Sequence, residues 1–279
     1  MEKSPKAKEV TQDLLDFLEG SPTSEWAAKN LSERLEEEGF HRVEISKNFE
    51  LQPGQKFYLL KEDSSLLAGI VGEGDLSRNG FKIVGAHTDS PGFRVKHDGM
   101  YEEEGYKQLG VEIYGGPLIA SWTDRDLSLA GKVALGRDDD IVTRLWKSDR
   151  NLLRISQLPI HLNREVNDEG LKLDKEKHLP PITGQAEGEG FSREDIKELI
   201  AEDLAVETSE VKDFELKLYD TQPASVLGLD GEFFASGRID NLMACFSAVE
   251  SLLEADEVPE STEVVTLFDN EEVGSNTAK

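Results

Sequence analysis

The stretch VVTLFDNEEV, Val264–Val273, joins an apolar run to a cluster of carboxylates. Its first half, Val264–Phe268, is typical of a buried strand, and Glu271 and Glu272 follow shortly after it. Ionised carboxylates at the end of a buried element are costly to hold unless a cation or hydrogen bonds compensate them. The pair therefore indicates one metal ligand and one catalytic base, the alternative being a solvated acidic turn.

A second polar group follows another apolar run. Residues Phe81–Ala86 predict a short buried strand, which delivers His87 at its end. A histidine in that position can offer one ring nitrogen to a metal, while Asp89 receives the other N–H and fixes the tautomer. A hydrogen-bonded turn histidine explains the same pattern, so this motif gains weight only beside the two glutamates.

Asp240 is the third polar group, and it stands directly before a predicted helix. Apolar residues recur after it at three- and four-residue spacing, as in a helix with one buried face: Leu242, Cys245, Val249 and Leu252. The alternative role for Asp240 is a helix N-cap. Because all three groups lie at junctions between buried elements and loops, the pattern favours an α/β sheet with a ligand at its strand ends.

Together these groups form a mixed set of one histidine and several carboxylates. Such a set suits zinc, with manganese or cobalt as alternatives. Two metal ions bridged by Asp240 would lower the pKa of a water molecule and polarise a substrate carbonyl, so the predicted chemistry is hydrolysis. The sequence contains no His-Glu-x-x-His helix, no Gly-x-Ser-x-Gly elbow and no phosphate loop.

Three segments carry a resemblance to a known family: Gly85–Pro91, Gly237–Leu242 and Asp269–Ser275. They resemble the signatures of the aspartyl aminopeptidases, which are dinuclear zinc metalloaminopeptidases. Two middle segments, Ser121–Gly131 and Leu158–Arg164, are similar to that family and stand in the family's order. The resemblance therefore extends over nearly the whole chain.

The resemblance implies a role for each polar group. It makes His87 a ligand of one zinc, Asp240 the bridge between two zincs and Glu272 a ligand of the second zinc. It makes Glu271 the general base. Asp89, which the His-x-Asp pattern places beside the metal-binding histidine, is counted as a third candidate catalytic residue with Glu271 and His161. The expected activity is the removal of N-terminal residues from peptides, and a preference for aspartyl or glutamyl residues rests on the resemblance alone.

His161 lies in the apolar stretch Leu158–Leu162. The resemblance implies that this histidine projects into the active site of a neighbouring subunit, as a catalytic residue supplied in trans. A buried histidine bonded to the backbone is the alternative. In related dinuclear aminopeptidases the peptide bond after the bridging aspartate is cis, which also predicts a cis bond between Asp240 and Asn241.

The resemblance implies an α/β fold in which a zinc-peptidase-type catalytic domain, with a mixed sheet flanked by helices, is interrupted by an inserted domain. Residues 1–91 and 226–279 are predicted as the two parts of the catalytic domain, the second part incomplete. Residues 92–225 are predicted as a mostly β dimerisation or lid domain, through which a homo-oligomer forms. Helices are expected around Ser24–Glu38 and Arg193–Leu204.

The resembled enzymes continue beyond this sequence and supply a further aspartate and a final histidine to the metals. We therefore expect the chain to be a fragment of a longer aminopeptidase that by itself binds metal poorly and is inactive or nearly so. The alternative is a truncated, catalytically inactive subunit that keeps only an oligomerisation or scaffold role.

Composition narrows the expected partners and location. The formal charge of −26 argues against nucleic-acid binding and against docking onto anionic membranes. The N-terminus has no apolar signal segment, and no apolar run approaches the length of a membrane span. Cys245 is the single cysteine, so an internal disulfide is excluded and the cytoplasm is the expected location.

Overall fold

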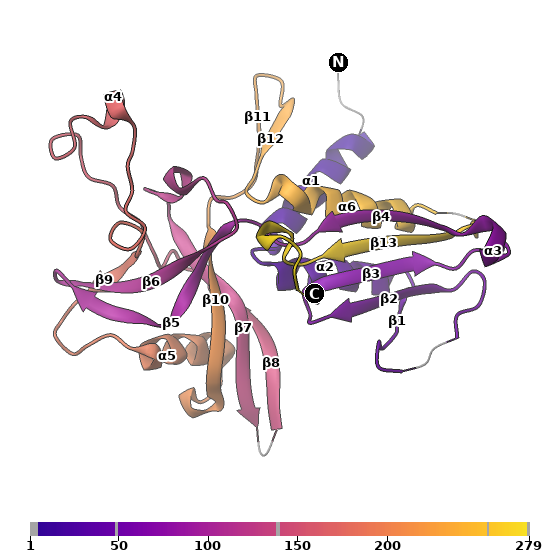
Figure 1. The fold of residues 1–279 in the computed structure, drawn as a ribbon, viewed down its shortest axis with the longest axis horizontal. Coiled ribbons are helices and arrows are strands. Elements are labelled where there is room, and N and C mark those ends of the chain that lie inside the picture. Colours follow the sequence, from indigo (N-terminus) through magenta and orange to yellow (C-terminus); the bar gives the residue numbers. More distant parts are fainter. Residues whose placement is uncertain (1–4, 48–49, 138–139, 256, 278–279) are drawn as a thin grey trace. The chain divides into compact units, whose positions relative to one another are not determined.

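The structure is a computed structural model that describes residues 5–47, 50–137, 140–255 and 257–277. It contains a mixed five-stranded sheet, an antiparallel six-stranded sheet and several helices, which confirms the predicted α/β class (Figure 1). The chain divides into two compact units, one formed by Met1–Ser90 with Pro223–Lys279 and the other by Pro91–Gln222. The dimerisation or lid role of the inserted unit stays a prediction.

The mixed sheet belongs to the first unit and runs in the order β1-β2-β3-β13-β4. Its hairpin β2–β3 is antiparallel, β13 pairs antiparallel with β3, and β4 pairs parallel with β13. Because β4 and β13 are parallel, their carboxyl ends meet at the same end of the sheet. The strands are β1 (His41–Arg42), β2 (Lys56–Lys61), β3 (Ser65–Ile70), β4 (Phe81–His87) and β13 (Thr262–Phe268).

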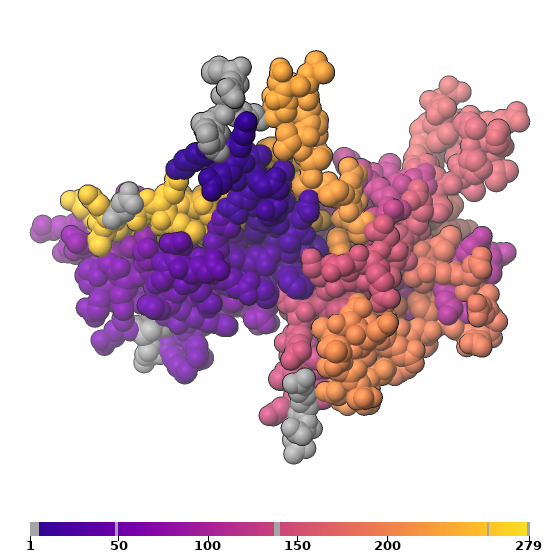
Figure 2. Space-filling view, turned by 180° about the vertical axis from the view of Figure 1, so that it is seen from behind, coloured from indigo at the N-terminus to yellow at the C-terminus, as the bar shows by residue number. Residues whose placement is uncertain are grey.

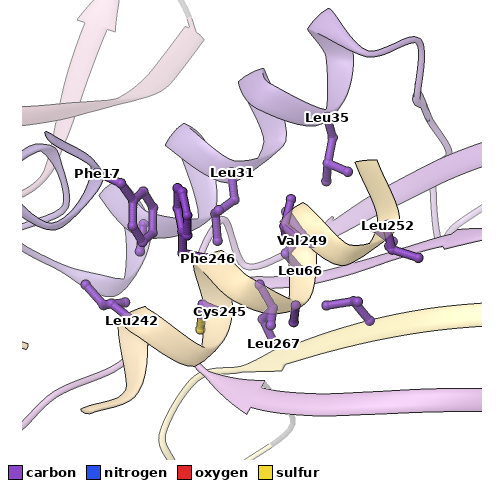
Figure 3. Packing of buried hydrophobic residues seen from close by; sticks show 14 of the residues in the cluster. Phe17, Leu31, Leu35, Leu66, Leu242, Cys245, Phe246, Val249, Leu252 and Leu267 are labelled. Carbon is purple, nitrogen blue, oxygen red and sulfur yellow. The ribbon is translucent and has the colours of Figure 1, made fainter. Parts of the chain in front are cut away.

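Three long helices cover this sheet: α1 (Pro5–Gly20), α2 (Ser24–Glu37) and α6 (Ile239–Leu253). The predicted helix from Ser24 is confirmed as α2, whereas the sequence pattern did not indicate α1. The apolar positions expected on α6 are buried, and they pack with side chains of the other two helices and of the sheet (Figure 3). This core includes Phe17, Leu31, Leu35, Leu66, Leu242, Cys245, Phe246, Val249, Leu252 and Leu267.

Shorter elements complete the first unit. Helix α3 (Leu76–Asn79) precedes β4, and the 3₁₀ turn η3 (Glu271–Val273) follows β13. Strands β11 (Ser225–Leu227) and β12 (Phe233–Ala235) form a two-stranded hairpin that stands out from its unit (Figures 1 and 2).

Strand β4 differs from the sequence prediction of a buried strand. Residues Phe81 to Gly85 are all exposed, although the run Phe81–Ala86 was predicted to be buried. The cause is the place of β4 in the sheet: it is the last strand in the order, and β13 is its one strand neighbour in the part of the chain that the structure describes. The apolar sequence is that of a central strand, but the position is that of an edge strand.

The second unit is built on the antiparallel sheet β8-β7-β10-β5-β6-β9. Helix α5 (Arg193–Leu204) confirms the second predicted helix, and it begins at a capping box between Ser192 and Asp195. Its inner face packs into a separate core with the strands. The strands are β5 (Gly92–Glu103), β6 (Tyr106–Tyr114), β7 (Leu127–Arg137), β8 (Asp140–Lys147), β9 (Ile182–Gln185) and β10 (Val211–Asp220), with η1 (Ile119–Trp122), α4 (Val166–Glu169) and η2 (Thr208–Glu210) between them. Of the helices in the described ranges, none is both long and apolar enough to cross a membrane.

Candidate metal centre

Two strand ends bring the polar segments of the sequence together. In the parallel pair, His87 at the end of β4 lies opposite Phe268 at the end of β13. Thr88 ties the two strand ends together: its N–H donates to the carbonyl of Phe268 (2.8 Å), and its hydroxyl donates to the carbonyl of Ser64 (2.7 Å). The turn η3 therefore starts beside His87, far along the chain but adjacent in space.

Three side chains converge at this point. His87, Glu271 and Glu272 each offer one possible ligand atom, and these atoms lie within 4.8 Å of one another. Asp240 joins them, because its Oδ1 is 3.4 Å from Nε2 of His87, while Oε2 of Glu271 is 3.9 Å from the same nitrogen. The His87 side chain is 13% exposed, against 83% for Asp240 and 55% for Glu271. The imidazole is thus held by its surroundings, and two carboxylates reach it from the solvent side.

Asp89 supports this cluster from the protein interior, through hydrogen bonds to the backbone of the two glutamates. It is 1% exposed, and its two carboxylate oxygens accept hydrogen bonds from the backbone N–H groups of Glu271 (3.2 Å) and Glu272 (3.1 Å). Nδ1 of His87 lies 3.1 Å from the carbonyl oxygen of Asp89 and 3.4 Å from its carboxylate. The imidazole N–H is therefore closer to the backbone carbonyl than to the predicted carboxylate, and the carboxylate chiefly holds the two glutamates in place.

A kink inside the first turn of α6, at Asp240 and Asn241, positions the Asp240 side chain. Arg238 adopts a left-handed conformation (φ 60°) and its guanidinium donates to the carbonyl of Leu18 (2.9 Å). The Asp240–Asn241 bond is cis, as the resemblance implied, and Ser90 donates its hydroxyl to the carbonyl of Asp240 (3.2 Å). The Asp240 carboxylate lies beside His87, and among the described residues it accepts no hydrogen bond from a backbone N–H of α6, so it does not act as the N-cap that the alternative required.

The body of α6 is fastened to the end of β4. The thiol of Cys245 donates to the carbonyl of His87 (3.0 Å), and the side-chain oxygen of Asn241 lies 3.5 Å from the N–H of His87. Burial raises the pKa of the Cys245 thiol to about 12, so this cysteine is a neutral hydrogen-bond donor and not a thiolate ligand.

The electrostatics of the cluster favour a cation. Burial raises the pKa of Glu272 above its ordinary value; His87 opposes this shift, and the neighbouring carboxylates of Asp89, Glu271 and Asp240 add to it. Carboxylates that raise one another's pKa are stabilised in their ionised form by a positive ion between them. The Glu272 carboxylate thus has a physical reason to bind a metal.

His161 belongs to the second unit, where it lies in an exposed turn between β8 and β9. Its neighbours Leu158, Ile160 and Leu162 are exposed as well. The alternative of a buried histidine bonded to the backbone is therefore wrong. The structure describes a single chain, so the role of His161 in the active site of a neighbouring subunit stays a prediction.

Sequence reasoning missed the residues that shape the turn. The N–H of Asp269 donates to the hydroxyl of Ser65 on β3 (2.9 Å), and the carboxylate of Asp269 accepts from the N–H of Asn270 (2.9 Å). Asn270 then adopts a left-handed conformation (φ 68°), which turns Glu271 back toward His87. Only the Asp-Asn pair gave a signal, as a turn-forming dipeptide; Ser65 looks like an ordinary strand residue.

The donor set of the cluster fits zinc. One imidazole nitrogen and two or three carboxylates, partly withdrawn from water, are ligands that zinc accepts. The convergence of ligand atoms within 4.8 Å is compact enough for an ion between them. The imidazole is oriented by the Asp89 carbonyl, as expected for a metal-binding histidine.

Comparison with known proteins agrees with this geometry. Residues 17–279 match the family described as "Aminopeptidase I zinc metalloprotease (M18)". A curated protein of Stutzerimonas stutzeri, described as a probable M18 family aminopeptidase 2, is 41% identical over 271 residues, which cover 96% of this chain and 62% of that protein. The present chain thus spans about three fifths of the length of this relative.

Solved structures show the same fold. A chain in the cryo-EM structure of the Ape4 and Nbr1 complex matches with a TM-score of 0.92 at 33% identity, covering 98% of this chain and 57% of that one. The structure of the S. cerevisiae mApe1 dodecamer matches with a TM-score of 0.82 at 25% identity, covering 98% of this chain and 63% of that one.

Proposed function

Because this chain belongs to the M18 family of zinc metalloproteases, we propose that its first unit carries the metal centre of an aminopeptidase that removes N-terminal residues from peptides. The observation that carries the proposal is the convergence of His87, Glu271 and Glu272, joined by Asp240, at the carboxyl ends of two parallel strands. Ligands of α/β sheets bind at such strand ends.

His87, Asp240 and Glu272 are the proposed ligands of two zinc ions, with Asp240 between them and manganese or cobalt as alternatives. When bound, zinc polarises the scissile carbonyl and makes water a stronger nucleophile near neutral pH. Glu272 suits a ligand because it is the more buried glutamate and its neighbours disfavour an uncompensated charge there.

Glu271 is the proposed general base. Its side chain is more exposed than that of Glu272, and it reaches to within 3.9 Å of the His87 imidazole without belonging to the buried layer. Its backbone is fixed by the Asp89 carboxylate, so its carboxylate can accept a proton from the attacking water and return it to the leaving amine. The order of the two glutamates, base and then ligand, thus has support in their exposure.

Three finer properties complete the proposal. A homo-oligomer formed through residues 92–225, with His161 supplied to a neighbouring subunit, has support from the dodecameric mApe1 structure and from the exposed turn around His161. A cytoplasmic location is in keeping with a single, buried cysteine. A preference for aspartyl or glutamyl residues rests on the family resemblance, because the acidic chain offers no general attraction for such substrates.

The test combines zinc content with activity. The purified chain is loaded with zinc, freed of excess and analysed for metal, and it is assayed with aspartyl and leucyl chromogenic amides beside the S. stutzeri relative. We expect some zinc in the wild type and loss of zinc in Asp240→Ala. Because the chain by itself is expected to be inactive or nearly so, the glutamate that matches Glu271 is changed to Gln in the S. stutzeri relative, where zinc should be retained without turnover. A folded wild type that takes up no zinc overturns the proposed centre. A folded chain that takes up no zinc and cleaves nothing favours the scaffold alternative.

A further inference from the structure

The antiparallel sheet of the second unit has one face in the core and one face outside it. Alternate residues of a strand lie on opposite faces, and Phe93 of β5 and Leu216 of β10 are buried in the core. Arg94 and Lys217, one position further along each strand, therefore lie on the other face, which we call the outer face. The two are direct partners across the neighbouring strands β5 and β10, and Glu112 of β6 lies opposite Arg94 on its other side (Figure 1).

The side chain of Arg94 contacts an aromatic ring and not a carboxylate. Its Cζ lies 4.1 Å from the ring centroid of Tyr114, within cation–π range, and Tyr114 is only 6% exposed. The guanidinium forms no hydrogen bond and no ion pair with any residue that the structure describes, although Glu112 stands directly across the strand pair. Its Nε is buried without a partner, whereas the terminal nitrogens Nη1 and Nη2 remain open to solvent. These outer N–H groups are available to an acceptor from outside the chain.

Lys217 brings a second positive charge to the same ring. Its Nζ lies 5.8 Å from the ring centroid of Tyr114, and because β5 separates β10 from β6, the lysine side chain extends over β5 to reach that distance. Arg94 and Lys217 are both partly buried, so water screens their mutual repulsion less than it does on an open surface. An anion bound beside the two cations offsets this repulsion.

The rest of the chain makes an arginine without a carboxylate unusual. Asp and Glu number 57 against 31 Lys and Arg, so carboxylates greatly outnumber their possible partners. Several arginines of the same unit have a carboxylate oxygen within 3.0 Å, among them Arg125, Arg150 and Arg154. Arg94 instead stacks on Tyr114, which leaves its terminal donors without an acceptor from the described chain.

We propose that Arg94, Lys217 and Tyr114 form an anion site on the outer face, which binds a side-chain carboxylate of an acidic peptide. The Nη groups of Arg94 present N–H donors in one plane, which match the two oxygens of a carboxylate, and the Lys217 ammonium adds a point charge. Stacking on Tyr114 keeps the guanidinium plane in place. The peptide as the source of the carboxylate rests on the proposed aminopeptidase function, whereas the anion site itself does not.

The charge of the chain favours a small anion over a polyanion. With a formal charge of −26, the protein repels a nucleic acid or a nucleoside triphosphate as a whole. Glu112, which is exposed beside Arg94, lowers the local positive charge and disfavours a polyanion as well. A single carboxylate meets two cations at short range and carries little charge to be repelled. Inorganic phosphate shares the oxyanion chemistry, so the test includes it as a separate probe.

The test is an NMR titration of the metal-free, isotope-labelled chain. The probes are acetyl-Ala-Glu-Ala-Glu-amide, its counterpart acetyl-Ala-Gln-Ala-Gln-amide and inorganic phosphate; the acetyl group prevents binding through an α-amine. The Nε–H signal of Arg94 is the local readout, because this nitrogen is shielded from water. We expect the acidic peptide to shift the signal with a dissociation constant in the millimolar range. The glutamine peptide leaves the signal unchanged, and phosphate binds more weakly than the acidic peptide.

Two variants and one control localise the binding, which is followed in each of them by the backbone amide signal of Tyr114. Arg94→Gln weakens binding about tenfold or more, because the charged hydrogen-bond donors are lost. Lys217→Gln weakens binding several-fold, and it carries the test if Arg94→Gln does not fold. The matched control Arg144→Gln, at an exposed arginine on β8 of the same sheet, leaves binding unchanged.

Three outcomes overturn the proposal. One is an Arg94 signal that does not move with the acidic peptide up to about 10 mM. Another is equal binding by the wild type and by the folded variants of Arg94 and Lys217. The third is phosphate binding at least as tight as that of the acidic peptide, which assigns the site to a free oxyanion. Zinc uptake is measured separately on the same preparation. Zinc uptake without peptide binding keeps the proposed function and rejects the anion site, and peptide binding without zinc uptake does the reverse.

Discussion

The buried carboxylate of Asp89 gives the sharpest prediction. Its two oxygens each accept one backbone N–H, from Glu271 and Glu272, in a site from which water is nearly excluded. In Asp89→Asn one oxygen becomes an amide NH₂ group, which cannot accept. One charge-assisted hydrogen bond is lost, at a cost of about 1.5–3 kcal/mol, because the abandoned backbone N–H finds no other acceptor. Asp89 then holds the turn that carries the two glutamates by one hydrogen bond instead of two.

The assay is backbone hydrogen exchange of the metal-free protein, read at the amides of Glu271 and Glu272. A loss of about 1.5–3 kcal/mol corresponds to exchange that is roughly 10- to 150-fold faster at one of the two amides. Zinc affinity falls in the same variant, because Glu272 is no longer fixed beside His87. The metal-free measurement separates the effect on the backbone from any direct effect on zinc.

The matched control is Asp75→Asn. The Asp75 carboxylate also accepts two hydrogen bonds, from the N–H (2.9 Å) and the hydroxyl (2.7 Å) of Ser77, but it is exposed at the start of α3. Asparagine caps helices about as well as aspartate, so little change is expected there. Unchanged exchange at both glutamate amides in Asp89→Asn would refute the reasoning, and so would a general loss of protection throughout the first unit.

Further predictions concern the core and the titrating groups. Leu31→Ala removes a fully buried side chain of α2 and lowers the free energy of unfolding of the first unit by about 2–5 kcal/mol, measured by urea denaturation; a loss near zero would contradict the packing. Cys245 is buried, and its pKa is about 12, so iodoacetamide at pH 8 does not alkylate it in the native protein but does so in urea. Mass spectrometry measures the alkylated fraction under each condition. The pKa of Glu272 is raised in the folded protein above its ordinary value of 4.5, so its contribution to the stability of the metal-free protein is present below pH 4.5 and is lost as the pH rises through the folded-state pKa. In Glu272→Gln this pH-dependent loss of stability is absent. Stability curves of wild type and variant that run parallel with pH would disprove the raised pKa.

Much of the candidate site was visible in the sequence because its groups stand at the ends of apolar runs. His87 ends β4, the glutamates follow β13, and Asp240 precedes the apolar positions of α6. Parallel pairing then brings the strand ends together, as the sheet rule predicts. The helices α2 and α5 were equally readable from their period. These are local patterns, and each one fixes its own element.

What the sequence left open depends on contacts between distant elements. The sequence predicted that the Asp89 carboxylate accepts the N–H of the histidine. In the structure it accepts hydrogen bonds mainly from two backbone amides, which lie 182 and 183 residues further along the chain. Strand β4 was expected to be buried because its composition is apolar, and no local pattern tells that it ends a sheet. Helix α1 escaped notice since its buried residues gather in its second half, leaving the first half polar and exposed.

The pairing of His87 with Phe268 joins two strands that are translated at very different times. The strand β4 leaves the ribosome before the whole inserted unit, and its strand partner β13 follows about 180 residues later. At typical elongation rates of about 5–20 residues per second, β4 waits roughly 9–36 seconds for β13. During that interval the apolar strand β4 lacks its partner β13, so the growing chain offers a binding site to chaperones and to other nascent chains. The metal centre can close only in the last moments of translation of this segment, after Glu272 has emerged.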